Sequence, residues 1–385
     1  MTFDFFSYFT SSITNQLILV VAFFALIQFF YYGLFFSRLA FKKHKIYPEP
    51  SHPVSVIVCA RNEYQNLKDF LPMILEQDYP QFEVILINDD SDDETEFLTR
   101  DLLLRYPHFR VVNINRSISF IKGKKFALSI GIKEAKYKHI LLTDADCCPA
   151  SSSWIRSMQS AFTDSTSIVL GYGRYEKEKG FLNRLVRFDT VHTALQYLSL
   201  ALSKMPYMGV GRNLSYTQAL FEEQKGFTSH YDVQYGDDDL FVNKAANGKN
   251  TIAIYNPLAH TVSIAPKTWG AWFRQKKRHL DTGKHYRFGT KIILGLYSSS
   301  SFFFYIFFAI SLFLSIYNIN ILNLIIINSF FFLRLITQII IYSGVCKKLK
   351  EKGIIWLVPF FDIIFTILNP FWAFSNVFIK QNKWK

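Results

Sequence analysis

Two aspartates separated by one residue, Asp144 and Asp146, follow an apolar run at residues 139–142. The run is bounded by polar residues, which predicts a buried parallel β-strand. In open α/β sheets, ligands bind beyond the carboxyl ends of such strands. Two carboxylates there suit a hard divalent cation that also holds substrate phosphates. Taken alone, the pair is equally consistent with a solvated turn that carries two surface acids.

A second acidic group lies at Gly236–Leu240, where Asp237, Asp238 and Asp239 precede an apolar stretch. A carboxylate at the head of a helix can act as a general base if it faces a reacting carbon. Three acids at a helix start can also have value only through the helix macrodipole.

The elements that position these acids begin at Val54, where apolar strands and helical stretches start to alternate with short connections. We expect strands at residues 54–59, 83–88, 110–114 and 139–144, with helices between them. This alternation predicts a Rossmann-like, mostly parallel α/β sheet. Polar or small residues follow the first two strands and open the helix before the fourth: Ala60, Arg61, Glu63, Asp89, Asp90, Lys122 and Lys124.

Composition indicates a chain that is partly embedded in a membrane. Charged residues make up only 19% of its 385 residues, and 40 residues are Phe. We expect about four spanning helices, near 17–36, 294–317, 321–343 and 354–378. Lysines after the first span place that flank in the cytoplasm, whereas the basic tail at 380–385 conflicts with the same rule.

The net charge is +13, but the basic residues form no nucleic-acid-binding motif. We therefore expect membrane lipids and a phosphorylated substrate as partners, and no nucleic acid. Basic and aromatic residues at helical spacing over 269–285 predict a helix that lies on the membrane surface. The four cysteines have no metal-ligand spacing, which favours a reducing compartment. The predicted division is 1–45 (first span and basic flank), 46–265 (α/β domain), 266–290 (interfacial segment) and 291–385 (remaining spans).

Two charges, Arg334 and Asp362, fall inside predicted spans. Charges at membrane depth are functional candidates, and they can also simply pair with each other. The sequence leaves both alternatives open.

The ordered motifs resemble those of membrane-bound family 2 glycosyltransferases, which include polysaccharide synthases and lipid glycosyltransferases. They are VSVIVCARNE, INDDSDDET, KGKKFAL, TDAD, GxGRN, GDDDL and QKKRH, and they cover roughly Val54–His279. The resemblance implies a GT-A fold, a nucleotide-sugar donor, a divalent metal (Mn²⁺ or Mg²⁺) and inversion at the sugar carbon. The sequence departs from the family pattern at three positions. No glycine follows Asp90, residue Asp237 stands where the family usually has Glu, and His279 stands where the family has a tryptophan.

The resemblance also implies a role for each motif residue. Asp146 would bind the metal, Asp144 would lie near the ribose or the metal, and Asp238, or else Asp237, would be the base. The expected nucleotide-sugar contacts are Ala60, Arg61, Glu63, Asp89, Asp90, Lys122, Lys124 and Asp144. The expected acceptor or diphosphate contacts are Gly211, Arg212, Asn213, Gln275 and Arg278.

We therefore expect inverting transfer from a UDP-sugar to a lipid-linked, lipid or growing polysaccharide acceptor. The transfer would take place at the cytoplasmic face of the inner membrane. Four spans are few for a polysaccharide channel, which favours a lipid acceptor. The alternative is a non-catalytic membrane scaffold that keeps a degenerate transferase domain.

Overall fold

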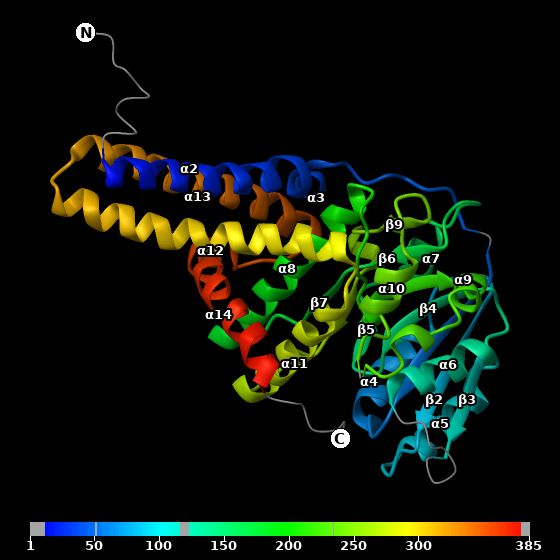
Figure 1. Cartoon of the computed structure of the whole chain (residues 1–385). Helices are drawn as coiled ribbons and strands as arrows, with labels where there is room; N and C mark the ends of the chain where they lie inside the picture. Colours follow the sequence, from blue (N-terminus) through cyan, green and yellow to red (C-terminus); the bar gives the residue numbers. More distant parts are fainter. Residues whose placement is uncertain (1–11, 51, 116–122, 234, 379–385) are drawn as a thin grey trace. The chain divides into compact units, whose positions relative to one another are not determined.

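The computed structural model describes residues 12–50, 52–115, 123–233 and 235–378. They form two compact units (Figure 1). The catalytic unit holds residues 43–286 together with 348–350. The other unit, called the membrane unit because it contains the predicted spans, holds residues 12–42, 287–347 and 351–378.

A seven-stranded sheet is the centre of the catalytic unit, with the strand order β3-β2-β1-β4-β8-β6-β9. Strands β3, β2, β1 and β4 are parallel, and β8 runs antiparallel to both of its neighbours. The predicted mixed, mostly parallel sheet is therefore confirmed. The strand bounds are β1 Val54–Ala60, β2 Phe82–Asp89, β3 Phe109–Ile114, β4 His139–Asp144, β6 Ile168–Leu170, β8 Leu214–Thr217 and β9 Thr251–Ala253.

A second sheet of three short strands lies beyond β4. Its order is β5-β10-β7, with β5 Cys147–Pro149, β7 Gly173–Tyr175 and β10 Thr261–Ser263. These strands have three residues each, too few for a hydrophobic period, so the sequence did not predict them.

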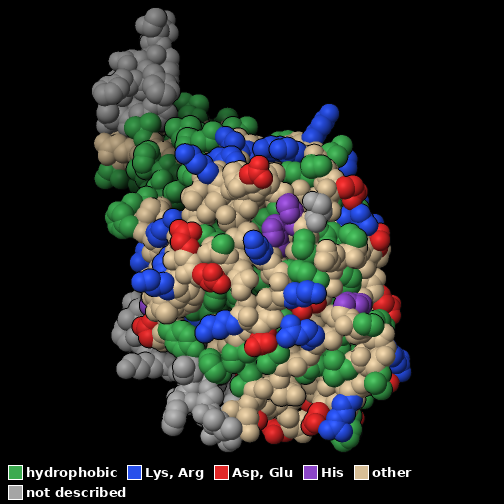
Figure 2. Space-filling view, turned by 90° about the vertical axis from the view of Figure 1, so that its right-hand side faces the viewer, with side chains coloured by type: hydrophobic (Ala, Val, Ile, Leu, Met, Phe, Trp, Pro, Cys, Tyr) green, Lys and Arg blue, Asp and Glu red, His purple; other side chains and the backbone are tan. Residues whose placement is uncertain are grey.

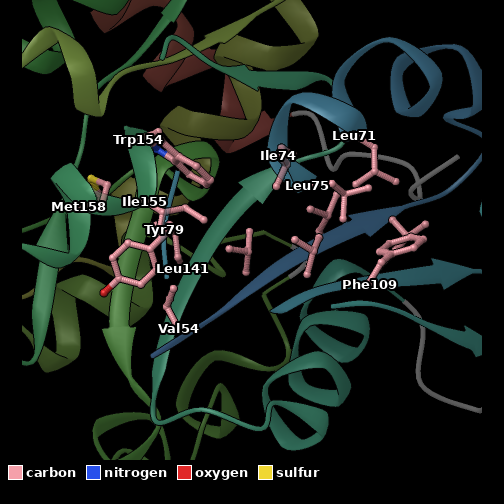
Figure 3. Close-up of a cluster of buried hydrophobic side chains, with 14 of the residues drawn as sticks. Val54, Leu71, Ile74, Leu75, Tyr79, Phe109, Leu141, Trp154, Ile155 and Met158 are labelled. Atoms are coloured by element: carbon pink, nitrogen blue, oxygen red, sulfur yellow. The ribbon is translucent and has the colours of Figure 1, made fainter. Parts of the chain in front are cut away.

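Helices pack on the sheet through apolar faces at helical spacing. On α4, Leu67, Leu71, Ile74 and Leu75 are buried against the sheet core, which also takes in Trp154 (Figure 3). The other helices of this unit are α5 Thr95–Arg105, α6 Lys124–Glu134, α7 Trp154–Gln159, α8 Phe181–Leu202, α9 Gln218–Glu223, α10 Asp239–Ala245 and α11 Trp269–Thr282, and α4 itself is Tyr64–Leu75. The predicted interfacial segment thus contains a helix, and its place on a membrane stays a prediction.

Each predicted apolar segment of the membrane unit is helical. By length and composition, three described helices could cross a membrane: Ile13–Phe41, Phe288–Tyr317 and Ile321–Leu349. The first joins α2 (Ile13–Phe30), a π-helical stretch (Tyr31–Phe36) and α3 (Ser37–Phe41), and the other two are α12 and α13. A fourth apolar helix, α14 (Val358–Phe378), completes the unit, so about four spans are consistent with the fold.

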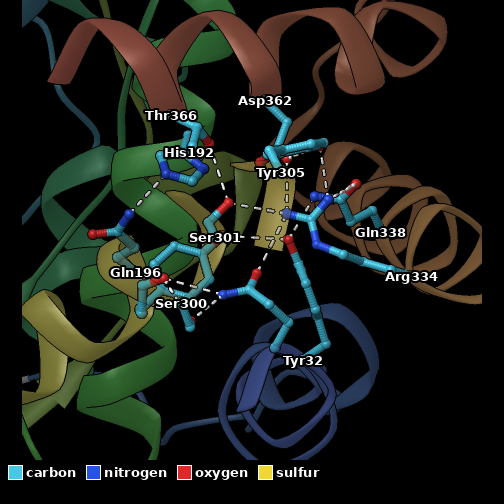
Figure 4. A network of polar contacts seen from close by, with 12 residues as sticks. Tyr32, His192, Gln196, Ser300, Ser301, Tyr305, Arg334, Gln338, Asp362 and Thr366 are labelled. Carbon is cyan, nitrogen blue, oxygen red and sulfur yellow. Dashed lines mark hydrogen bonds and ion pairs between the residues drawn. The ribbon is translucent and has the colours of Figure 1, made fainter. Parts of the chain in front are cut away.

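Arg334 and Asp362 pair with each other. Arg334 Nη2 on α13 lies 2.8 Å from Asp362 Oδ2 on α14, and both side chains are almost fully buried. The same guanidinium donates to the hydroxyls of Tyr305 and Ser301 on α12 and to Gln28 on α2 (Figure 4). The network therefore ties the four helices together. Of the two alternatives for Arg334 and Asp362, the structure shows that they pair with each other.

Candidate active site

The parallel strands bring their polar ends to one edge of the sheet. Cys59 at the end of β1 pairs with Asp144 at the end of β4, and Ala60 pairs with Asn88 on β2. A cleft of ≈ 470 Å³ opens at this edge. Its lining residues are Cys59, Ala60, Arg61, Glu63, Asp89, Lys124, Ala127, Asp144, Ala145, Asp146, Tyr235, Gly236, Asp237, Asp238, Asp239, Gln275, Arg278, His279 and Thr282.

Asp144 and Asp146 face this cleft from the turn between β4 and β5. One oxygen of each and the Cys147 sulfur lie within 4.8 Å of one another. Burial and the neighbouring Asp144 charge raise the pKa of Asp146, as expected for two carboxylates with too little positive charge between them. Burial also raises the pKa of the Cys147 thiol well above its usual range, so sulfur stays a poor ligand. The donor set thus fits a hard, oxygen-loving cation held by the two aspartates.

Lys124 links the two acidic groups of the cleft. Its Nζ lies 2.6 Å from Asp144 Oδ1 and 3.2 Å from Asp237 Oδ2. Burial works against the charged lysine, but the acids outweigh it and raise its pKa well above the usual range. Burial alone would raise the pKa of Asp144, but the contact with Lys124 outweighs burial and lowers that pKa. Lys124 therefore carries a permanent positive charge between both groups.

Asp238 has the surroundings of a general base. It caps α10, its Oδ2 accepts the Gly211 backbone N–H at 2.7 Å, and its Oδ1 accepts the Asp239 N–H at 2.7 Å. Burial, followed by the charges of Asp237 and Asp239, raises the pKa of Asp238 to about 7. A carboxylate with a pKa near the working pH is the best proton acceptor.

The two acids beside Asp238 make different contacts. Asp239 accepts the Thr282 hydroxyl and, at 2.8 Å, the Tyr286 hydroxyl, which fixes it as a structural link to α11 and the chain that follows. Asp237 contacts Lys124. Gly236 has φ +94°, and a Cβ there would lie 2.5 Å from Leu240 Cδ1, so the turn into these acids requires glycine.

The Gly211–Asn213 turn contacts the cleft acid Asp238. The Gly211 backbone N–H donates to Asp238 Oδ2. The Arg212 guanidinium lies 4.4 Å above the Tyr175 ring and is not among the lining residues of the described cleft. Asn213 is fully buried, donates to the carbonyls of Tyr172 and Ala259, and accepts the Trp154 indole N–H. Direct acceptor contact by Asn213 was therefore a wrong expectation, because every one of these bonds would have to break.

Helix α11 contributes the last wall. Gln275 donates to the Tyr175 hydroxyl at 2.6 Å, and the Arg278 guanidinium lies 5.4 Å from the Tyr235 ring. His279 also lines the cleft. His279 is itself exposed, so this wall presents a guanidinium and an imidazole to the cleft.

The Glycosyl transferase family 2 model matches residues 55–221. This chain carries a family 2 glycosyltransferase domain. It is 24% identical over 242 residues to the poly-β-1,6-N-acetyl-D-glucosamine synthase of Staphylococcus epidermidis, covering 60% of this chain and 54% of that protein. The corresponding Staphylococcus aureus synthase is 23% identical over 256 residues, 63% of this chain and 57% of that one. The chain thus spans little more than half the length of these curated relatives.

A solved structure shows the same fold. The mannosyltransferase from Pyrobaculum calidifontis, in complex with GDP-Man and Mn²⁺, superposes with a TM-score of 0.58 at 19% identity. The match covers 89% of this chain and all of that chain. At this identity the likeness establishes the GT-A fold and nothing finer.

Most predicted nucleotide contacts of the glycosyltransferase domain reach the cleft: Ala60, Arg61, Glu63, Asp89, Lys124 and Asp144. Asp90 has φ +58° and is not among the lining residues of the described cleft, so its contact with the nucleotide stays a prediction. Lys122 lies outside the described residues.

Sequence reasoning gave no role to five lining residues of the glycosyltransferase domain: Cys59, Ala127, Ala145, Tyr235 and Thr282. Cys59 is the residue before a predicted one, so the strand end itself was a sufficient signal. Tyr235 immediately precedes the glycine and acids of the second group. Thr282 carried no signal, since its place depends on how α11 packs.

Proposed function

We propose that this chain is an inverting glycosyltransferase that moves a sugar from a nucleotide-diphosphate sugar to an acceptor hydroxyl. One observation carries the proposal: a single cleft holds a cation-fitting acid pair and a separate carboxylate, Asp238, with a raised pKa. The first group suits a diphosphate and the second suits a proton. The Staphylococcus relatives are named as synthases of poly-β-1,6-N-acetyl-D-glucosamine, which makes UDP-N-acetylglucosamine the first donor to test.

On the donor side, Asp146 and Asp144 would hold Mn²⁺ or Mg²⁺, which neutralises charge that develops on a leaving diphosphate. Lys124 adds a fixed positive charge beside Asp144. Ala60, Arg61, Glu63 and Asp89 surround the place for the nucleoside. Arg278 on α11 supplies a further cation for the diphosphate.

On the acceptor side, Asp238 takes the proton from the acceptor hydroxyl. As that oxygen forms its bond to the anomeric carbon, the bond from this carbon to the diphosphate oxygen breaks, and the nucleoside diphosphate leaves. Gly211 and the Asp239 N–H hold the two carboxylate oxygens in place. Attack from the face opposite the leaving group inverts the anomeric configuration.

The acceptor we favour is a lipid or lipid-linked glycan, with a growing polysaccharide as the second candidate. The small number of apolar helices in the described chain supports this choice, because about four spans are few for a polysaccharide channel. The names of the Staphylococcus relatives support a polymer instead. We keep the predicted division, with a cytoplasmic catalytic domain at 46–265 and an interfacial segment at 266–290, as part of the proposal.

The test is UDP release from UDP-N-acetylglucosamine and other UDP-sugars by the purified full chain in detergent, with and without Mn²⁺ or Mg²⁺. Turnover should require the cation and stop with EDTA. Asp146→Asn should abolish turnover, whereas Asp101→Asn, a matched control at an exposed position of α5, should leave it near the wild-type rate. Equal activity of all three proteins would refute the site. UDP binding without turnover of any donor would favour a non-catalytic scaffold.

A further inference from the structure

Two short basic segments of the chain continue directly from candidate membrane spans. Residues 42–45 follow the helix Ile13–Phe41, and residues 347–352 begin within the last turn of Ile321–Leu349. Together the segments contain seven lysines and one glutamate. Because each is covalently joined to the end of a span, both lie at a membrane surface if those helices cross the bilayer.

Parts of both segments meet on one aromatic residue of the catalytic unit, Tyr255. The His44 ring lies 4.2 Å from the Tyr255 ring, and Lys348 Nζ lies 5.1 Å from the same ring. The Tyr255 hydroxyl donates to the Lys43 carbonyl at 3.2 Å. Residues about 300 positions apart in sequence thus meet on one ring, which brings the lysine-rich segments at 43–45 and 348–350 to one surface. Lysines gathered on one surface favour the binding of an anion.

This surface also combines charge with an exposed apolar side chain. Lys43 and Lys350 are exposed, Lys348 is half-buried, and Ile46 is 93% exposed. Lysines around an exposed aliphatic side chain suit the boundary between lipid headgroups and acyl chains. By contrast, basic and acidic side chains are interspersed over most of the face in Figure 2.

We propose that the surface formed by Lys43, His44, Lys348 and Lys350 around Tyr255 binds the phosphate headgroups of anionic phospholipids. Lysines close to an anionic surface each raise affinity by roughly fivefold, so three of them distinguish an anionic from a zwitterionic lipid clearly. The inference needs the membrane placement of the proposed function but not the sugar transfer. Lipid binding is therefore measured separately from turnover.

The experiment places the full chain in nanodiscs and measures the association of spin-labelled phosphatidylglycerol relative to spin-labelled phosphatidylcholine. The wild-type protein should prefer phosphatidylglycerol several-fold, and added salt should weaken the preference. The Lys43→Gln, Lys348→Gln, Lys350→Gln triple variant should lose most of it. The same three positions changed to Arg should retain it.

A matched control removes equal charge from exposed lysines elsewhere on the catalytic unit, Lys133, Lys225 and Lys249, and should retain the wild-type preference. The proposal is overturned if the first Gln variant keeps its preference while remaining folded by thermal unfolding. It is also overturned if inorganic phosphate, at matched ionic strength, removes the preference, because the surface would then serve a soluble anion. Failure of UDP release in the same nanodiscs would count against the proposed function alone.

Discussion

Buried charge serves different ends in the two units of this molecule. In the membrane unit, Arg334 and Asp362 bond to each other and to polar side chains on neighbouring helices. In the cleft, by contrast, Lys124 contacts Asp144 and Asp237, and the pKa values of Asp146 and Asp238 are still raised by burial and nearby acids. An ion pair that is hydrogen-bonded to neighbouring helices holds those helices together, whereas acids in excess of positive charge attract a cation and a proton.

The largest test of this contrast is Asp238→Asn. The amide keeps the size and one acceptor oxygen for the Gly211 N–H but cannot take a proton. We expect kcat to fall by about 10²- to 10⁴-fold, while the Kd for UDP stays within a few-fold. Steady-state UDP release and calorimetric UDP titration measure the two quantities. Loss of UDP binding together with turnover would show that Asp238 serves the donor and not the proton.

Breaking the membrane pair should instead cost stability. Arg334→Met leaves the Asp362 carboxylate buried without its partner, so we expect the free energy of unfolding to fall by about 3–5 kcal/mol. The double variant Arg334→Met, Asp362→Leu should recover most of the loss, since no lone charge remains. Thermal unfolding in detergent measures both. The idea fails if the single variant is as stable as wild type, or if its folded fraction has lost kcat.

The sequence predicted the first half of the site well, because that half depends on local pattern. Long apolar runs identify β1, β2 and β4, and parallel strands necessarily bring the residues at their ends together. The second half depends on distant packing. Asn213 looks like a ligand contact in sequence, yet its side chain is fixed by Tyr172, Ala259 and Trp154 from three other segments.

Lys125 shows the same limit, because nothing in its motif distinguishes it from Lys124. Its side chain is 5% exposed, and its Nζ donates to the carbonyls of His230 and Val233 at 2.7 Å each. These carbonyls precede the turn into Asp238, so we expect Lys125 to act as a positioning residue for the proposed base.

Lys125→Met removes both hydrogen bonds and keeps the aliphatic stem. We expect kcat to fall roughly tenfold, with little change in the donor KM, because small misplacements of a catalytic group are costly. Lys125→Arg should restore part of the rate. Lys133→Met, at an exposed position of the same helix, is the control and should behave as wild type. A rise in donor KM with unchanged kcat would place Lys125 on the nucleotide side instead.

The smallest expected effect is that of Asp237→Asn, which tests whether Asp237 or Asp238 is the base. After burial, the Asp237 charge is the main cause of the raised pKa of Asp238, so its removal should lower that pKa. Because the base must be deprotonated, wild-type turnover should fall as pH drops below about 7, and the variant should keep its activity to a lower pH, by up to about one unit. Asp281→Asn, at a half-buried acid of α11 that pairs with Lys284, should leave the profile unchanged. If Asp237 were the base, Asp237→Asn would lose turnover at every pH, and Asp238→Asn would retain a pH-dependent rate.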